Sequence, residues 1–141
     1  MKFVSSFEPI DHTADVGYRL FAPTLAELFA VAGRALFDAI TELDSIQPKF
    51  ERQVEAEAGD IEALLVAWLS ELNFRCVTEL ELYGEFFIDS ISPSAVRATV
   101  RGEKIDPARH VIHTEIKAVT YHELFVREVE GGWEAQVIFD V

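Results

Sequence analysis

Residues 122–141, HELFVREVEGGWEAQVIFDV, contain the chain pairing that decides the fold. Gly131-Gly132 is a two-residue turn between two runs rich in apolar and aromatic side chains, and this pattern predicts a β-hairpin. In the register set by that turn, Glu123 lies opposite Asp140. The other facing pairs would be Val126 with Val137 and Leu124 with Phe139. Two carboxylates that face each other repel unless a cation or hydrogen bonds lie between them. The predicted register therefore requires one or the other at the end of the last strand.

Two stretches upstream of the hairpin have the spacing of amphipathic helices. Thr24 and Glu27 have capping-box spacing at the start of the first helix, and Asp60 is the predicted N-cap of the second. The apolar stripes are Leu25, Leu28, Phe29, Ala32, Leu36 and Ile40 in the first helix, and Ile61, Leu64, Leu65, Trp68, Leu69 and Leu72, continuing toward Cys76, in the second. Each helix therefore has one face to bury, which requires a sheet to receive it.

Apolar and polar residues alternate with a period of two over three further stretches, which predicts strands with one wet face. These stretches are 16–22, 53–58 and 96–101, and a further strand is predicted at 85–91, before the turn Ser92-Pro93-Ser94. Residues 102–114 are predicted to be a loop or small insertion. Because strands alternate with helices and then follow one another, we expect an α+β layered sandwich. Both helices would pack on one face of a mainly antiparallel or mixed sheet, with a C-terminal hairpin.

Composition restricts the class of protein. The 141 residues are 50% hydrophobic and contain no repeat or linker, so we expect one domain over 1–141. The net charge of −13 disfavours direct binding to nucleic acid or anionic membranes and favours cations and basic partner proteins. A single cysteine, Cys76, excludes an intramolecular disulfide. Since no signal peptide and no membrane-spanning apolar run is apparent, a cytoplasmic location is expected.

Two acidic positions are candidate metal ligands. The cluster Asp11-His12-Thr13-Ala14-Asp15 places oxygen and imidazole groups in one predicted loop, and Asp140 is the penultimate residue. Turn capping by the cluster and solubilisation of the chain end by Asp140 are the alternatives. A structural or surface role is expected for each of the four histidines, His12, His110, His113 and His122. No zinc motif, phosphate-binding loop or nucleophile elbow is present, so the residues themselves do not indicate an enzyme.

Five segments together resemble the archease family. Asp11-His12-Thr13-Ala14-Asp15-Val16-Gly17 is similar to its opening motif, and residues 24–37 and 68–72 look like its two helices. Residues 116–122 and 132–141 resemble its C-terminal signature. The resemblance runs in order from about Phe7 to the last residue, which makes it far more specific than any one segment.

The resemblance implies an accessory protein of the RtcB-type RNA ligase in tRNA splicing and RNA repair, and not an enzyme. Such a protein promotes guanylylation of the ligase and allows multiple turnover. By motif, the family's divalent-metal site, typically calcium, falls on Asp15, Asp140 and the main chain of Val141, with magnesium or manganese as alternatives. His12 and Glu123 are candidates, on position alone, to hydrogen-bond these ligands.

Two other classes of function remain open. A chaperone-like binding module without a dedicated ligase partner should expose an apolar patch. A metal-dependent hydrolase would need a pocket with a base and an open metal position, and the sequence offers no independent base or nucleophile for it.

Overall fold

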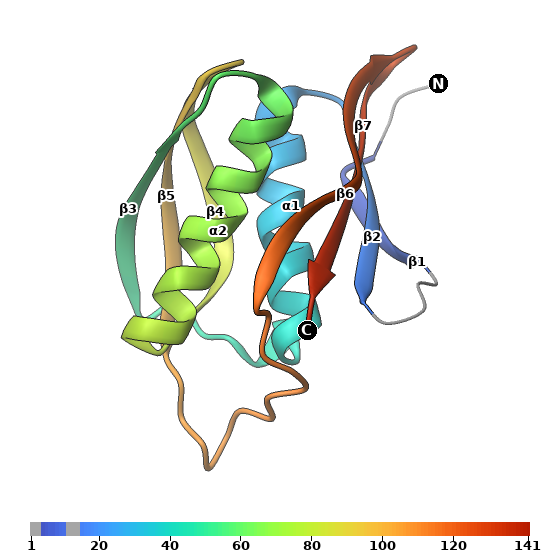
Figure 1. The fold of residues 1–141 in the computed structure, drawn as a ribbon. Coiled ribbons are helices and arrows are strands. Elements are labelled where there is room, and N and C mark those ends of the chain that lie inside the picture. The colour runs from blue at the N-terminus through green and yellow to red at the C-terminus, as the bar shows by residue number, and fades with distance from the viewer. Residues whose placement is uncertain (1–3, 11–14) are drawn as a thin grey trace.

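Two helices lie between two antiparallel sheets in the computed structural model, which describes residues 4–10 and 15–141 (Figure 1). The elements follow in the order β1 (Ser6–Ile10), β2 (Val16–Ala22), α1 (Leu25–Ile40), the 3-10 helix η1 (Leu43–Ser45), β3 (Phe50–Glu57), α2 (Ile61–Glu79), β4 (Glu81–Ser92), β5 (Ala95–Lys104), β6 (Ala118–Val129) and β7 (Gly132–Asp140). No helix within the described residues is long and apolar enough to cross a bilayer.

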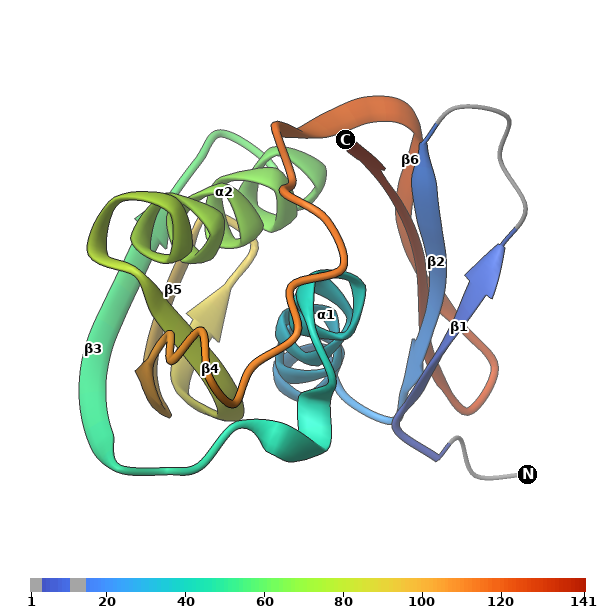
Figure 2. The same ribbon diagram turned by 90° about the horizontal axis from the view of Figure 1, so that it is seen from below.

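The strands form one sheet in the order β1-β2-β7-β6 and a second in the order β3-β5-β4. Figure 2 shows the helices as the middle layer, with one sheet on either side. The predicted α+β layered class and the C-terminal hairpin are confirmed, and the helices pack against two sheets rather than one. The reason lies in α1, which is buried on nearly every side and contacts β2 of one sheet and β4 of the other.

Side-chain caps fix the start of both helices, as the sequence predicts. The Thr24 hydroxyl accepts a hydrogen bond from the Glu27 amide at 3.1 Å, and the Asp60 carboxylate accepts one from the Ala63 amide at 2.8 Å. Each cap satisfies an amide that has no partner inside the helix. The apolar stripes of both helices are buried as expected, except that Leu25 and Ile61 at the helix starts are half-buried.

Several boundaries differ from the prediction: β1 was not predicted, β3 begins at Phe50 rather than at residue 53, and β6 begins at Ala118 rather than at residue 122. β4 begins at Glu81, ahead of the predicted strand, and β5 continues through Lys104, so the loop before β6 runs over 105–117. The strand continues because Gly102 pairs with Tyr83 of β4 and with Phe50 of β3. A glycine within a strand permits this close approach of the neighbouring backbone.

The predicted register of the hairpin is wrong. The two-residue turn is Glu130-Gly131, with Gly131 at φ 88°, and not Gly131-Gly132. Val126 pairs with Ala135 rather than with Val137. Phe139 pairs with Val119 rather than with Leu124, and Asp140 pairs with Ala118 rather than with Glu123. A register shift between Thr120 and Phe125 adds to the displacement, since it leaves extra residues of β6 without a partner in the ladder.

Candidate functional site

β2 begins and β7 ends at the same end of their sheet (Figure 1), and Asp15 and Asp140 belong to that end by the register of the two strands. β2 begins at Val16, and Val16 pairs with Phe139 in the antiparallel ladder with β7. Asp15 and Asp140 each lie one residue beyond this pair. At facing positions of such a ladder, Cα atoms lie about 4.5–5.5 Å apart. The hairpin therefore lies beside the strand that follows Asp15, as the resemblance implies, and acidic residues from distant parts of the chain become neighbours.

Backbone pairing also holds the end of β7 on its other side. The Lys117 amide donates a hydrogen bond of 2.7 Å to the Asp140 carbonyl, and Ala118 pairs with Asp140. Phe139 is fully buried, and adjacent strand residues point to opposite faces, so the side chain of Asp140 points away from the helices and is exposed. Val141 packs partly against the core.

The chemistry of these groups suits a hard divalent cation. Carboxylate and main-chain oxygens are the ligands that calcium and magnesium prefer. Within residues 4–10 and 15–141, no group of three or more His, Cys, Asp or Glu side chains could hold a metal ion. Asp15, Asp140 and the main chain of Val141 would therefore share the cation with water or with ligands from elsewhere. Asp11 and His12 lie outside the described residues.

Glu123 does not face Asp140, as it would in the predicted register. It lies within the register shift of β6, with φ at 51°. Its backbone carbonyl accepts a hydrogen bond of 3.0 Å from the side-chain amide of Gln136. The position across from Asp140 belongs instead to Ala118.

The most buried acidic group of the second sheet is Glu103 on β5, and sequence reasoning missed it. Its carboxylate accepts hydrogen bonds from the Gln47 amide at 2.6 Å and from Arg109, and lies 3.1 Å from Nε2 of His110. Burial alone would raise the pKa of Glu103, but these hydrogen bonds and the Arg109 charge outweigh it and lower the pKa to about 2.

His110 belongs to the same buried cluster, which defines its role. The Asp106 amide donates to Nδ1 of His110 at 2.8 Å, so the proton of the neutral ring lies on Nε2 and is donated to Glu103. The side chain of His110 is fully buried. This cluster ties the 105–117 loop to β5, and the expected structural role of His110 is confirmed.

Glu81, at the start of β4, is a second buried carboxylate with satisfied partners. It accepts two hydrogen bonds from Arg52, at 3.2 and 2.9 Å, and one from the Tyr83 hydroxyl at 2.6 Å. Burial would raise the pKa of Glu81, yet the Tyr83 and Arg52 contacts lower it overall. The Arg52 contact joins β3 to β4, so the Glu81 carboxylate has a structural role, as the Glu103 carboxylate does. The sequence analysis placed Glu103 in the predicted loop 102–114 and Glu81 ahead of the predicted strand 85–91, which is why neither was found there.

Comparisons with known proteins all point to one family. The model described as Archease protein family (MTH1598/TM1083) matches residues 7–141. The protein archease of Methanopyrus kandleri is 42% identical over 138 residues, which cover 96% of this chain and 99% of that relative. The protein archease of Pyrococcus furiosus is 35% identical over 139 residues, covering 96% of this chain and 98% of the relative.

Solved structures agree with this assignment. The solution structure of Methanobacterium thermoautotrophicum protein 1598 is similar with a TM-score of 0.79 at 33% identity, covering 96% of this chain and 98% of that one. The crystal structure of a Thermotoga maritima archease, titled "possible chaperone", shares the fold with a TM-score of 0.64 at 22% identity, covering 95% of this chain and 96% of that one. With its family model, its relatives and its fold in agreement, this chain belongs to the archease family.

Proposed function

We propose that this archease is an accessory protein of an RtcB-type RNA ligase in tRNA splicing and RNA repair. It would promote guanylylation of the ligase and allow multiple turnover, without catalysing a reaction itself. Family membership supports the proposal. The observation that carries it is the approach of Asp15 and Asp140 at one end of the β2–β7 ladder, where a motif from each end of the chain contributes one carboxylate.

In this proposal, Asp15, Asp140 and the main chain of Val141 hold a divalent cation, with calcium as the first choice and magnesium or manganese as alternatives. A bound cation would supply positive charge for phosphate oxygens. The protein's own contribution is rigidity, because β2 holds β7 on one side and the Lys117 amide holds Asp140 on the other. Where both side chains reach one cation, its charge offsets the repulsion between their carboxylates.

The overall charge supports a basic partner. With 25 acidic and 12 basic residues, the protein carries a net charge of −13. A ligase that binds RNA needs a positively charged channel, and opposite charges on two proteins accelerate their association. The same charge disfavours direct binding of this protein to RNA.

The test is guanylylation of the ligase from the same source with GTP and a divalent metal, with this protein absent or present in substoichiometric amounts. We expect faster guanylylation and several ligation events per ligase molecule when it is present. An unchanged rate and a single turnover would contradict the accessory role.

A chaperone-like binding module is the second candidate, and one observation favours it. Phe74 and Val77 on α2 and Leu80 at its C-cap are exposed by 57%, 44% and 56%, and such a patch suits contacts with protein clients. The Thermotoga maritima archease is described as a possible chaperone. Under this candidate, the protein would suppress heat-induced aggregation of unrelated test proteins, such as citrate synthase. Suppression without any effect on the ligase would favour it over the accessory role.

A further inference from the structure

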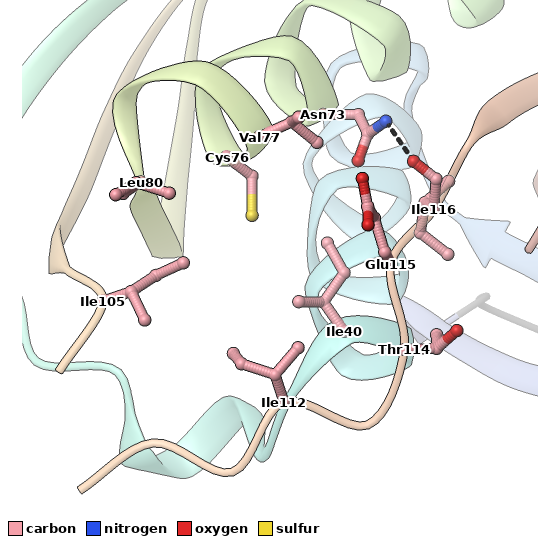
Figure 3. A pocket seen from close by; sticks show the side chains of 10 residues that line it. All are labelled: Ile40, Asn73, Cys76, Val77, Leu80, Ile105, Ile112, Thr114, Glu115 and Ile116. Atoms are coloured by element: carbon pink, nitrogen blue, oxygen red, sulfur yellow. Dashed lines mark hydrogen bonds between the residues drawn. The ribbon is translucent and has the colours of Figure 1, made fainter. Parts of the chain in front are cut away.

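A groove runs along the C-terminal half of α2, between this helix and residues 112–119. It consists of two adjoining hollows, with cavity volumes of about 240 and 490 Å³. Both are lined by Asn73 and Val77 from α2 and by Glu115 and Ile116 from the loop before β6. We call this feature the α2 groove, and Figure 3 shows the smaller hollow from close by.

The groove exposes apolar side chains on both of its walls. Val77 of α2 and Leu80 at its C-cap are exposed by 44% and 56%, and Ile112 of the loop by 44%. The Phe74 ring, 57% exposed, lines the larger hollow. Large apolar side chains gathered around one depression are typical of a site that a partner covers.

A buried acceptor at the junction of the two hollows has no partner. The Nδ2 group of Asn73 donates to the Ile116 carbonyl at 2.8 Å, whereas Oδ1 accepts no hydrogen bond from any described residue. Asn73 is only 8% exposed, and Figure 3 shows its amide oxygen turned toward the interior of the pocket. Leaving such a buried acceptor unsatisfied is unfavourable. An occupant that brings an N–H donor would satisfy it.

Glu115 adds negative charge at the same place. Its side chain is exposed and lines both hollows. Burial, and to a smaller extent the charge of the Glu115 carboxylate, raise the pKa of the Cys76 thiol to about 11. The charge of Glu115 therefore acts on Cys76 in the wall of the groove. A carboxylate and an unpaired amide oxygen both require donors, and a cationic side chain provides several.

The groove leads toward Asp140. Its larger hollow is lined by Lys117 and Ala118, which are the residues that bond to and pair with Asp140. A protein segment bound in the groove would therefore contact the residues that hold the backbone of Asp140, whereas the Asp140 side chain points to the other face of the sheet.

We propose that the α2 groove receives a segment of the ligase in which an apolar side chain adjoins a lysine or arginine. The apolar side chain packs between α2 and the 112–119 segment, and the cationic group donates to Asn73 Oδ1 and Glu115. This inference rests on the proposed function, because it takes the ligase as the partner.

The test is the affinity of the ligase for this protein, measured by isothermal titration calorimetry. Val77→Lys places a positive charge in the groove, and Glu115→Gln removes its carboxylate; both residues are exposed, so folding should persist and is checked by circular dichroism. Phe87→Lys on β4, where Phe87 is 45% exposed, and Glu130→Gln in the hairpin turn are the matched controls. We expect about tenfold or greater weakening for each groove variant and unchanged affinity for the controls, because Val77→Lys repels the cationic segment and Glu115→Gln leaves its cationic group without the carboxylate.

Each outcome separates the two proposals. If the wild-type protein binds and activates the ligase but both groove variants bind as the wild type does, or weaken no more than the controls, the groove is not the docking site and the accessory function stands. If the wild-type protein neither binds nor activates the ligase, the proposed function fails, and the ligase segment in the groove fails with it.

Discussion

The backbone amide of Lys117 donates a hydrogen bond of 2.7 Å to the carbonyl of Asp140. This contact joins the candidate metal site to the α2 groove, because Lys117 also lines the groove. One short segment before β6 therefore holds the acidic end of β7 and forms part of a surface suited to a partner. Binding in the groove and the placement of Asp140 are physically connected through this segment.

Cation binding should stabilise the protein against heat. If Asp15 and Asp140 share the ion, calcium at roughly 100 times its Kd adds about 2.7 kcal/mol to the free energy of unfolding. Thermal unfolding with calcium chloride and with EDTA measures the difference in Tm. Asp140→Asn should abolish the shift, while Asp89→Asn on β4 should retain it. An equal shift in Asp140→Asn would show that calcium binds elsewhere.

Glu103 should stabilise the fold in a pH-dependent way. Its pKa is about 2 in the folded protein against an ordinary value of 4.5, so the stabilisation is complete above this ordinary value and is lost as pH falls from there toward 2. Glu103→Gln should lower the free energy of unfolding by about 2 kcal/mol at pH 7, since hydrogen bonds to a charged group are lost.

Urea unfolding of Glu103→Gln and wild type across this pH range measures the effect. The difference between the two proteins should shrink as the pH falls below 4.5, because the wild-type advantage depends on the ionised carboxylate. A difference that stays constant down to pH 2 would refute the assigned role of the charge.

Gly102 should not tolerate a side chain. A Cβ at this position would overlap the Leu82 carbonyl oxygen and lie 2.9 Å from the Tyr83 Cα atom, both of which are backbone atoms. Gly102→Ala should therefore destabilise the protein by at least about 2 kcal/mol. Gly59→Ala is the control, because nothing lies within 4 Å of the added Cβ. Urea denaturation compares the two variants, and equal midpoints would contradict the close packing of β4 on β5.

Cys76 should react slowly in the folded protein. Burial, with the Glu115 charge, raises its pKa to about 11, so only about one thiol in a thousand is ionised at pH 8. Labelling with a disulfide reagent such as DTNB should be far slower in buffer than in guanidinium chloride, where the thiol is released. Equal rates in the two solvents would mean that the thiol is accessible in the folded state.

Local features were predictable from the sequence because they depend on neighbouring residues. Thr24 and Asp60 cap the helices as expected, and the alternation at Val96, Ala98 and Val100 identifies a strand with one buried face. The partition into two sheets was not predictable, because α1 is buried on nearly every side and its sequence does not say which strands cover each face.

The candidate site was predictable only in part. The motif resemblance named Asp15 and Asp140, and the β2–β7 register brings them together. The position of Glu123 was wrong because Gly131-Gly132 allows two placements of the turn, and the shift near Glu123 has no evident sequence signal. The unpaired oxygen of Asn73 could not be foreseen either, since an asparagine on a helix stripe does not reveal what surrounds its amide.

The most direct test of the central claim measures how Asp15→Asn, Asp140→Asn and the double variant stimulate guanylylation of the ligase at substoichiometric amounts, with Asp89→Asn as the control. The account predicts that each single variant loses most of the stimulation, that the double variant loses no more than the worse single variant, and that Asp89→Asn behaves as the wild type. Full stimulation by the double variant would show that the accessory function does not depend on this pair of carboxylates.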